Sequence, residues 1–461
     1  MMVRLKGFTL AEIVEATGGV LVQGSSSSRV RGVSTDTRSI GRGELFVAVR
    51  GGNFDGHDFL AGAAKSGATA LLVDRKDVAL PNNVAAVRVD DTVRAYGLIA
   101  RYHRRRFSIP VIAVTGSAGK TTTKELVASV LRRKYRVLYN KGTDNNHIGV
   151  PATLLRLRAG HTAAVIETGT NHPGEIDWLA SIVEPTVAVF TNVGPSHLAG
   201  LGTPEGVFHE KAALAKHVAA GGTLIVNTDD ALLAGLLRDP AEHKVVSYGV
   251  EKPADLQAGK VEADARRISF VADGTRFEIK TPSRSNVYNA LAAIACGRLL
   301  GVPTEDVRRG LLAFRTPPGR QVVHRLVGLT LIDDTYNANP LSFRNALQTL
   351  GNMRGKGRSV VVCADMLELG DSAERLHRDV GAFAAAQGVD VLLTCGRLAH
   401  FIALEARAQR PETDVRQPAD QAAALEELKG ILRPGDVVLV KGSRGMRMEK
   451  VVQGLTEYLK G

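Results

Sequence analysis

Small and charged residues between positions 116 and 122 give the clearest chemical signal in this sequence. An apolar run at 111–115 leads into residues whose types suit phosphate binding: Gly116, Ser117, Gly119, Lys120, Thr121 and Thr122. Glycines let backbone N–H groups approach phosphate oxygens, a lysine ammonium reaches the β- and γ-phosphates, and a threonine hydroxyl can ligate Mg²⁺. The usual spacing would place a first glycine where Val114 stands, so the loop is a variant. It predicts a site for a nucleoside triphosphate.

Two strand-like runs after this loop lead to groups that could bind a metal. The run 163–166 ends at Glu167, where nucleotide-binding sheets commonly place a Mg²⁺ ligand or a group that orients water. After the run 187–190, His197 lies in a loop bent by glycine and proline, where it could ligate a metal or contact phosphate. Lys211 lies in a helical pattern, where an exposed lysine is the ordinary case. By residue pattern alone, His197 and Lys211 stay without an assigned role.

Residues 140–144 are similar to the guanine-binding Asn-Lys-x-Asp sequence, but Asp144 comes one residue too late. Guanine recognition depends on a fixed geometry at a strand end, so the extra residue disfavours a GTPase. The expected nucleotide is therefore ATP.

The elements that must position these groups alternate between apolar strand-like runs and helical stretches. Three segments show this alternation, with expected strands at 44–49 and 70–73; at 111–114, 163–166, 187–190 and 223–226; and at 330–332, 359–362, 391–393 and 437–440. The first segment also contains an expected helix at 59–66. Two prolines and a glycine within 315–320 interrupt a helical pattern and mark the second boundary.

These patterns predict an α/β protein of three domains. A small N-terminal α/β domain spans 1–106, and a central domain of the phosphate-loop type with a mostly parallel sheet spans 107–314. A Rossmann-like, doubly wound α/β domain spans 315–461, and its ligand contacts are expected at the carboxyl ends of its strands.

Composition adds broad limits. The chain has 461 residues, 44% of them hydrophobic, and a net charge of +12 that is spread along the sequence. The densest basic run, 101–106, is typical of a solvated helix end, and we place it at a domain junction. Cys296, Cys363 and Cys395 are far apart, which disfavours a disulfide framework or a zinc site and suits a reducing cytoplasm. Since no apolar run reaches about 18 residues and no signal-peptide core is present, we expect a cytoplasmic protein without membrane insertion.

The chain also resembles the ATP-dependent Mur ligases of bacterial cell-wall synthesis along essentially its whole length. The resemblance rests on the variant phosphate loop together with the segments 145–151, 191–197 and 286–293. Further segments resemble the branch of this family that adds D-alanyl-D-alanine to a UDP-N-acetylmuramoyl-tripeptide: 34–38, 55–59, 333–340, 364–370 and 441–444. Threonines on both sides of Gly169, and Ser285 before Asn286, depart from the family pattern and bear more on packing than on chemistry.

The resemblance implies binding roles for several residues. Contacts to the UDP-sugar precursor are implied for Ser34, Arg38, Asp55 and His57. Contacts to ATP are implied for the phosphate loop, Asn289, Arg320 and Asp334, the last at the ribose. Asn337 and Arg444 would lie near the nucleotide and the incoming dipeptide. The first domain would hold the UDP-sugar, the middle one ATP, and the last would close over both.

The resemblance also implies two Mg²⁺ ions and a modified lysine. One ion would lie at Thr121 and Glu167, and the other at His197 and Lys211. Lys211 matches a lysine that family members carry as a carbamate, which turns an ammonium group into a metal-binding anion. Lys120, Lys211 and His197 would be the catalytic residues.

The implied activity is ATP-dependent amide ligation in peptidoglycan precursor synthesis, through an acyl phosphate, by a monomer that does not bind nucleic acid. One alternative is a ligase of the same plan with a different acceptor, such as a folate, which the loop 336–340 disfavours. Another is a nucleic-acid-stimulated ATPase or a nucleotide sensor, which only the net charge of +12 suggests. The basic residues are not interleaved with aromatic ones as in single-strand binders.

Overall fold

The computed structural model describes residues 7–52, 54–238, 240 and 242–460. The chain divides into two compact units. The first comprises Met1–Ala113, Tyr135–Thr168 and Asp177–Thr186, and the second comprises Val114–Lys134, Gly169–Ile176 and Val187–Gly461. Among the described residues, no helix combines the length and the apolar character that crossing a bilayer requires.

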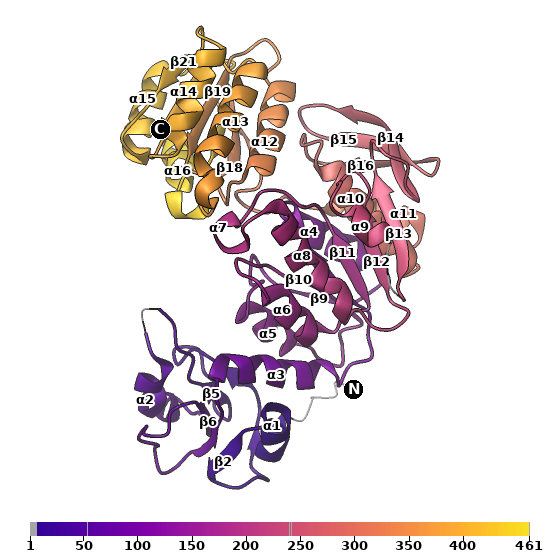
Figure 1. Ribbon diagram of the computed structural model, residues 1–461, viewed down its shortest axis with the longest axis vertical. Helices are drawn as coiled ribbons and strands as arrows, with labels where there is room; N and C mark the ends of the chain where they lie inside the picture. The colour runs from indigo at the N-terminus through magenta and orange to yellow at the C-terminus, as the bar shows by residue number, and fades with distance from the viewer. Residues whose placement is uncertain (1–6, 53, 239, 241, 461) are drawn as a thin grey trace. The chain divides into compact units, whose positions relative to one another are not determined.

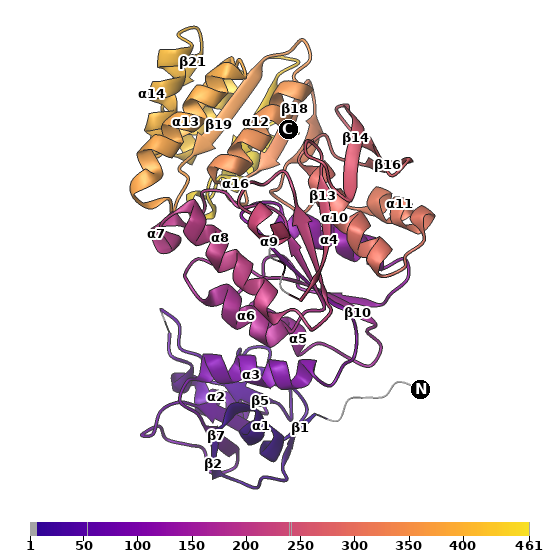
Figure 2. The same cartoon turned by 45° about the vertical axis from the view of Figure 1, so that its right-hand side comes forward.

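The N-terminal part of the first unit is built on a five-stranded sheet. Its order is β2 (Val20–Gln23), β7 (Ala85–Arg88), β6 (Ala70–Val73), β5 (Leu45–Val47) and β4 (Val33–Ser34), with β2 antiparallel and the others parallel. A two-stranded sheet pairs β1 (Phe8–Thr9) with β3 (Arg29–Val30). Leu45 and Val47 pack in one cluster with α1 (Leu10–Thr17) and α3 (Thr92–Arg104), while Phe46 packs with α2 (Leu60–Lys65), which follows the 3₁₀ helix η1 (Gly56–Phe59) (Figure 2). Both faces are therefore covered, as a parallel-rich sheet requires.

The basic run 101–106 is less solvated than its composition suggests. Arg104 is buried, and its guanidinium donates to three backbone carbonyl oxygens over distances of 2.7–3.2 Å. Arg101 and Arg105 form ion pairs with the carboxylate of Glu184 at 2.8 and 2.5 Å. The expectation of a solvated helix end is wrong for Arg104, because the last turn of α3 packs against neighbouring backbone. The positive charges of this run are satisfied by carbonyl oxygens and by Glu184 within the same unit.

Strands from residues 107–314 form a nine-stranded sheet. Its order is β16 (Thr275–Ile279), β15 (Ile268–Ala272), β14 (Leu256–Ala263), β13 (Lys244–Gly249), β12 (Thr223–Asn227), β11 (Val187–Phe190), β8 (Val111–Thr115), β10 (Ala163–Glu167) and β9 (Val137–Tyr139). Its helical elements are α4 (Lys120–Leu131), α5 (Gly149–Leu154), α6 (Glu175–Val183), α7 (Leu198–Leu201), α8 (Pro204–Ala212), η2 (Ala213–His217), α9 (Ala234–Arg238), α10 (Asn286–Leu299) and α11 (Thr304–Ala313).

This sheet is parallel where the sequence predicted strands and antiparallel at one edge. β11, β12 and β13 are parallel, whereas β14, β15 and β16 form an antiparallel extension. The extension was not predicted, because an antiparallel strand with one solvated face lacks a continuous apolar run. Buried and exposed residues alternate at the start of β14, as in Leu256, Gln257 and Ala258.

The C-terminal sheet has six strands in the order β17 (Val322–Leu326), β18 (Leu329–Asp334), β22 (Val437–Lys441), β19 (Ser359–Ala364), β20 (Val391–Cys395) and β21 (Asp414–Arg416). Its helical elements are α12 (Pro340–Met353), η3 (Gly370–Ser372), α13 (Ala373–Ala386), α14 (Ala399–Gln409), α15 (Gln421–Ile431), η4 (Arg444–Met446) and α16 (Glu449–Tyr458). Val361 of β19 packs with α12, α13 and α14, while its neighbours Val360 and Val362 pack with α15 and α16 (Figure 1). This alternation builds the expected doubly wound domain, with β17 as an antiparallel edge.

The short helix α7 joins this C-terminal core. Leu198 and Leu201 are buried in the same cluster as Phe343 of α12 and Leu369. Val207 of α8 belongs to the cluster as well. The helices that follow β11 are thus packed into the C-terminal part of the second unit.

Candidate functional site

The loop after β8 has the backbone geometry of a phosphate-binding turn. Gly116 has φ 150°, and a Cβ atom at this position would lie 1.9 Å from the Thr191 hydroxyl oxygen. Gly119 has φ 80° and stands at the N-cap of α4, which begins at Lys120 without a side-chain cap. Glycine is required at 116 by the close approach and is favoured at 119 by the positive φ.

The segment after β11 holds this loop in place. The Ser117 and Ala118 N–H groups donate to the backbone and side-chain oxygens of Asn192, at 2.9 and 2.8 Å. The Lys120 ammonium donates to the Gly116 carbonyl oxygen at 2.7 Å. Because two loop N–H groups are used inside the protein, a phosphate would meet the first turn of α4, where the helix dipole adds partial positive charge. Thr121 and Thr122 are buried in that turn, adjacent in sequence to Lys120.

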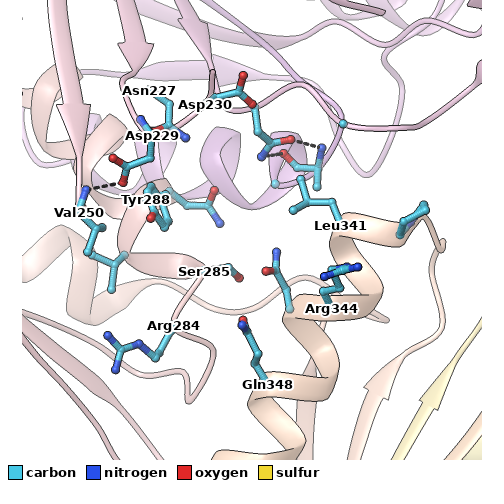
Figure 3. A pocket seen from close by; sticks show the side chains of 18 of the residues that line it. Asn227, Asp229, Asp230, Val250, Arg284, Ser285, Tyr288, Leu341, Arg344 and Gln348 are labelled. Atoms are coloured by element: carbon cyan, nitrogen blue, oxygen red, sulfur yellow. Dashed lines mark hydrogen bonds between the residues drawn. The ribbon is translucent and has the colours of Figure 1, made fainter. Parts of the chain in front are cut away.

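A cavity of about 770 Å³ adjoins Gly119 in the second unit. Asn289 of α10 lines it, accepts a hydrogen bond from the Thr123 hydroxyl at 2.9 Å and donates to Asn286 at 2.8 Å. Figure 3 shows Asp229, Tyr288 and Val250 on one wall, and Leu341, Arg344 and Gln348 of α12 on the other. The cavity's volume lies within the range of small-molecule sites, about 300–1,000 Å³. Its position beside the phosphate loop suits the rest of a nucleotide.

Asp229 fixes one wall of this cavity. Its carboxylate accepts N–H bonds from Val250, Glu251 and Lys252 at 2.7–2.9 Å. Burial alone would raise the pKa of Asp229, but these hydrogen bonds outweigh it and lower the pKa. Burial raises the pKa of Tyr288, whose hydroxyl bonds to the same carboxylate. Asp229 therefore stays ionised and orders the wall.

The ends of β18 and β22 bring together several residues expected near ATP. Asp334 and Lys441 occupy paired positions on these parallel strands, and their side chains form a buried ion pair of 2.7 Å. The Lys441 ammonium also donates to the backbone oxygen of Asn337 at 3.0 Å. Burial raises the pKa of Asp334, and the ammonium of Lys441 opposes that effect. The sequence predicted no role for Lys441, and the structure shows that its ammonium holds the carboxylate of Asp334, the predicted ribose contact.

Tyr336 lies close to the two predicted arginines of this region. The Arg320 guanidinium stands 4.2 Å from the Tyr336 ring centroid, and the Arg444 guanidinium stands 5.9 Å from it. Arg444 is exposed and pairs with Glu449 at 3.2 Å. The structure therefore groups four predicted residues around one loop: Arg320, Asp334, Asn337 and Arg444. It adds Tyr336, for which the sequence predicted no binding role.

His197 and Lys211 have unusual environments. Burial and the nearby Lys120 ammonium lower the pKa of His197, while the Glu368 carboxylate, 2.6 Å from Nδ1, opposes them. Lys211 is buried, and its pKa lies well below the ordinary value because of burial and repulsion from Lys120. A lysine held as a neutral amine is nucleophilic and can add carbon dioxide. The structure therefore supports a chemical role for a residue that the helical pattern alone left unassigned.

Glu167 ends β10 in the first unit and is buried. Its Oε1 accepts from the Asn145 side chain at 2.8 Å, and its backbone N–H donates to Asn140 at 2.9 Å. Thr121, His197 and Lys211 belong to the second unit. Within the described part of the chain, no group of three or more His, Cys, Asp or Glu residues could hold a metal ion. A hydroxyl or a lysine carbamate would add ligands of other types.

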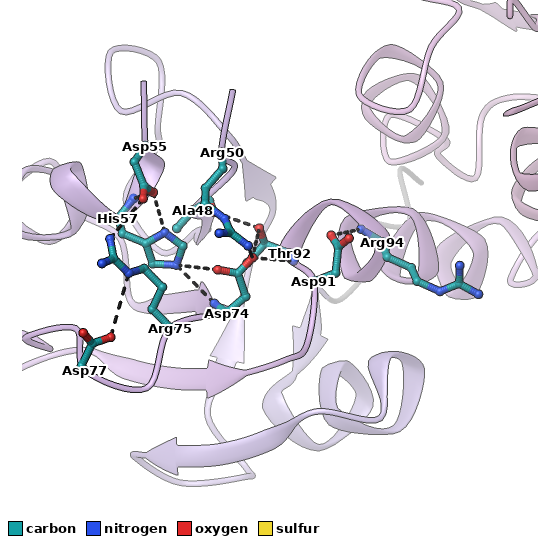
Figure 4. A network of polar contacts seen from close by, with 10 residues as sticks. All are labelled: Ala48, Arg50, Asp55, His57, Asp74, Arg75, Asp77, Asp91, Thr92 and Arg94. Carbon is teal, nitrogen blue, oxygen red and sulfur yellow. Dashed lines mark hydrogen bonds and ion pairs between the residues drawn. The ribbon is translucent and has the colours of Figure 1, made fainter. Parts of the chain in front are cut away.

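The N-terminal residues form two small polar arrangements. Ser34 accepts from the Asp36 N–H at 3.2 Å, and Asp36 pairs with the exposed Arg38 at 2.7 Å, which lowers the pKa of Asp36 to about 2. In the second arrangement, the buried ring of His57 places Nδ1 2.6 Å from Asp55 and Nε2 3.3 Å from Asp74 (Figure 4).

This second arrangement links the segments that follow β5 and β6 with the start of α3. Asp74 also accepts from Arg50 at 3.1 Å and from the Thr92 hydroxyl at 3.4 Å, and Asp55 pairs with Arg75 at 3.2 Å. The side chain of His57 is 1% exposed. In this structure its ring therefore orders Asp55 from inside the domain.

Comparison with known proteins places the whole chain in one family. Family models match three segments: "Mur ligase family, catalytic domain" at 29–104, "Mur ligase middle domain" at 114–297 and "Mur ligase, glutamate ligase domain" at 319–444. A UDP-N-acetylmuramoyl-tripeptide–D-alanyl-D-alanine ligase of Bacillus subtilis is 36% identical, over 97% of this chain and 98% of its own. The enzyme of that name from Escherichia coli is also 36% identical, with the same coverage.

Solved structures agree. MurF from Acinetobacter baumannii has a TM-score of 0.90 and 33% identity, covering 99% of this chain and all of its own. MurF ligase from Thermotoga maritima, in complex with ADP, has a TM-score of 0.83 and 28% identity over 93% of this chain and 98% of its own. These matches confirm the predicted α/β fold of three domains.

Proposed function

Since this chain belongs to the Mur ligase family, we propose that it is an ATP-dependent ligase that joins D-alanyl-D-alanine to a UDP-N-acetylmuramoyl-tripeptide in peptidoglycan precursor synthesis. The observation that carries this proposal is the full-length similarity to ligases of that name, at 36% identity. The phosphate loop and the adjoining cavity support the proposal, because together they could hold ATP. The alternative is a related amino-acid ligase with a different acceptor.

The chemistry explains why ATP is required. A carboxylate is a poor electrophile, so its oxygen first attacks the γ-phosphorus of ATP, the bond to the bridging oxygen breaks, and ADP leaves. The amine of D-alanyl-D-alanine then attacks the acyl carbon, phosphate leaves with the electron pair, and the nitrogen loses a proton to solvent. Lys120 and the first turn of α4 would offset the repulsion between the carboxylate and the triphosphate.

The donor groups that the family resemblance assigns to two Mg²⁺ ions are of types that bind this metal if Lys211 is carbamylated. We assign Thr121 and Glu167 to one ion, and His197 and carbamylated Lys211 to the other. The buried, low-pKa amine of Lys211 supports this assignment, because an unprotonated amine can add carbon dioxide and the resulting carbamate would supply a ligand oxygen. When bound, such ions neutralise phosphate charge and stabilise the charge that develops during transfer.

Each predicted domain has a proposed task. Residues 1–106 would hold the UDP-sugar through Ser34, Arg38 and Asp55, with the buried His57 acting through Asp55. Residues 107–314 would bind ATP, and 315–461 would close over it and present the dipeptide near Arg444. The protein would act as a cytoplasmic monomer. Closure predicts a more compact small-angle scattering profile with an ATP analogue and the UDP-substrate; an unchanged profile would count against it.

The decisive experiment measures ADP release with ATP, the UDP-muramoyl-tripeptide and D-alanyl-D-alanine, and with each left out in turn. We expect product only when all three are present, with diaminopimelate- and lysine-containing acceptors tested in parallel. Two replacements test the alternative ligase: glutamate in place of D-alanyl-D-alanine, and a folate in place of the UDP-muramoyl-tripeptide. ADP release stimulated by nucleic acid, and lost at high salt, would instead favour a nucleic-acid-dependent ATPase.

A further inference from the structure

Two residues with unusual backbone conformations meet at His197. Among the described residues, seven non-glycine positions have positive φ, and two of them, His197 (φ 54°) and Glu368 (φ 64°), are hydrogen-bonded to each other. The His197 Nδ1 and Glu368 Oε2 atoms are 2.6 Å apart. A left-handed backbone is unfavourable for residues that carry a Cβ, so the surroundings must hold both residues in place.

The surroundings do so through backbone and apolar contacts. The Ala199 N–H donates to the Glu368 carbonyl oxygen at 3.1 Å. A Cβ atom at Gly370 would lie 3.4 Å from the Cα of Ala199, so the two segments are in close contact. Leu198 and Leu369 are buried in the same apolar cluster. The residues beside His197 and beside Glu368 are therefore packed against each other.

The residues just before Glu368 are also held by hydrogen bonds to other segments of the C-terminal domain. The Leu367 N–H donates to the Ser443 hydroxyl at 2.8 Å, and the Met366 N–H donates to His377 at 2.9 Å. Asp365 accepts two N–H bonds from the start of α14, at 3.0 and 2.7 Å. The Glu368 side chain is 54% exposed, so these contacts hold its backbone, and its hydrogen bond to His197 orients the carboxylate.

We propose that Glu368 is a positioning residue for His197, holding the ring proton on Nδ1 so that Nε2 is the acceptor nitrogen. The inference rests on the proposed function, in which His197 binds a metal. Metal-binding histidines ordinarily donate their other ring N–H to a carboxylate or carbonyl, which fixes the tautomer and the ring orientation. Because Glu368 follows β19 and His197 follows β11, the contact also makes the orientation of His197 depend on docking of the C-terminal part of the second unit.

Glu368→Gly tests this role with little risk to folding, because glycine readily adopts the positive φ of position 368. We expect kcat for ADP release to fall about 10- to 100-fold, with KM for D-alanyl-D-alanine unchanged and the thermal midpoint equal or higher. Glu368→Gln retains an acceptor oxygen and should recover part of kcat. Lys260→Gly is the matched control, since Lys260 is exposed and also has positive φ, 49°; its kcat should not change.

A second measurement does not depend on activity. Long-range ¹H–¹⁵N spectra of histidine-labelled protein, without nucleotide or metal, report the tautomer of each ring, and His197→Gln identifies the His197 signals. We expect an Nδ1–H tautomer in the wild type and a mixture in Glu368→Gly. An unchanged tautomer in that variant, or a changed tautomer with an unchanged kcat, would overturn the proposal. A wild-type protein without ligase activity would refute the proposed function, and the spectra would still decide whether Glu368 orients His197.

Discussion

The phosphate loop and the end of β18 both present polar groups at the carboxyl ends of parallel strands, but they are built differently. The phosphate loop is contiguous, and its glycines and lysine lie within a few residues of each other. At the end of β18, Asp334 is held by Lys441, which lies 107 residues further along the chain. One site consists of consecutive residues that Asn192 supports through two hydrogen bonds, whereas the other exists only when two strands are in register.

This difference decides what a substitution does. In the contiguous loop, replacement of the Lys120 side chain should affect nucleotide chemistry more than the fold, because the loop backbone keeps its hydrogen bonds to Asn192. In the assembled pair, removal of one partner leaves a buried charge, so the fold should suffer first. The following variants test that division, in order of decreasing expected effect.

Replacement of Lys441 should have the largest effect. Lys441→Met leaves the Asp334 carboxylate buried without its ammonium partner, and we expect a loss of about 3–5 kcal/mol in the free energy of unfolding. Urea unfolding followed by circular dichroism measures this loss. The double variant Asp334→Asn/Lys441→Met removes both charges and should be the more stable of the two. A single variant as stable as the wild type would mean that the pair does not support the fold.

Replacement of Lys120 should act on chemistry instead. Lys120→Ala should lower kcat for ADP formation about 10²–10³-fold, because a preorganised cation beside the transferred phosphate is lost. Its thermal midpoint should match that of the wild type. Lys356→Ala, at an exposed position, is the control for a lost positive charge. Retained turnover in Lys120→Ala would contradict the assignment of the phosphate loop.

Gly119→Ala separates backbone strain from steric conflict. Its φ of 80° disfavours a side chain by about 1–2 kcal/mol, and the new Cβ would lie 2.7 Å from the Asn289 side-chain oxygen. We expect lower stability and weaker ATP binding in calorimetry. Gly274→Ala has a similar φ of 70° with nothing within 4 Å of the new Cβ, so it should lose stability without losing ATP affinity. Equal ATP affinities would contradict a role for the Gly119–Asn289 contact.

Asp229→Asn should have the smallest effect, and one that depends on pH. The folded state lowers the pKa of Asp229 below its ordinary 3.8, so its contribution is present above that value and is lost as pH falls through the folded pKa. At pH 7 the variant should be less stable by about 1–2 kcal/mol. The difference from wild type should shrink as the pH falls below 3.8. A difference that stays constant from pH 7 to below 3.8 would show that the charge of Asp229 is not the cause.

The same contrast explains what the sequence could predict. The strands β6 and β11 match the expected runs 70–73 and 187–190 residue for residue, because buried parallel strands are continuous apolar segments. The phosphate loop could be predicted because its glycines and lysine are neighbours in sequence. The roles of Lys441 and Glu368 could not be predicted from the sequence, because each depends on a partner that only strand order or packing brings near. The burial of Arg104 was missed for the same reason.

The insertion of α7 into the C-terminal core has a consequence for how this protein loses its structure. Leu198 and Leu201 lie in a cluster with residues of α12, α13 and α14, so neither side can unfold without exposing apolar surface on the other. Heating should therefore melt the β11-to-α8 segment and the six-stranded sheet in one cooperative transition. Polar substitution of Leu198 should split that transition in two.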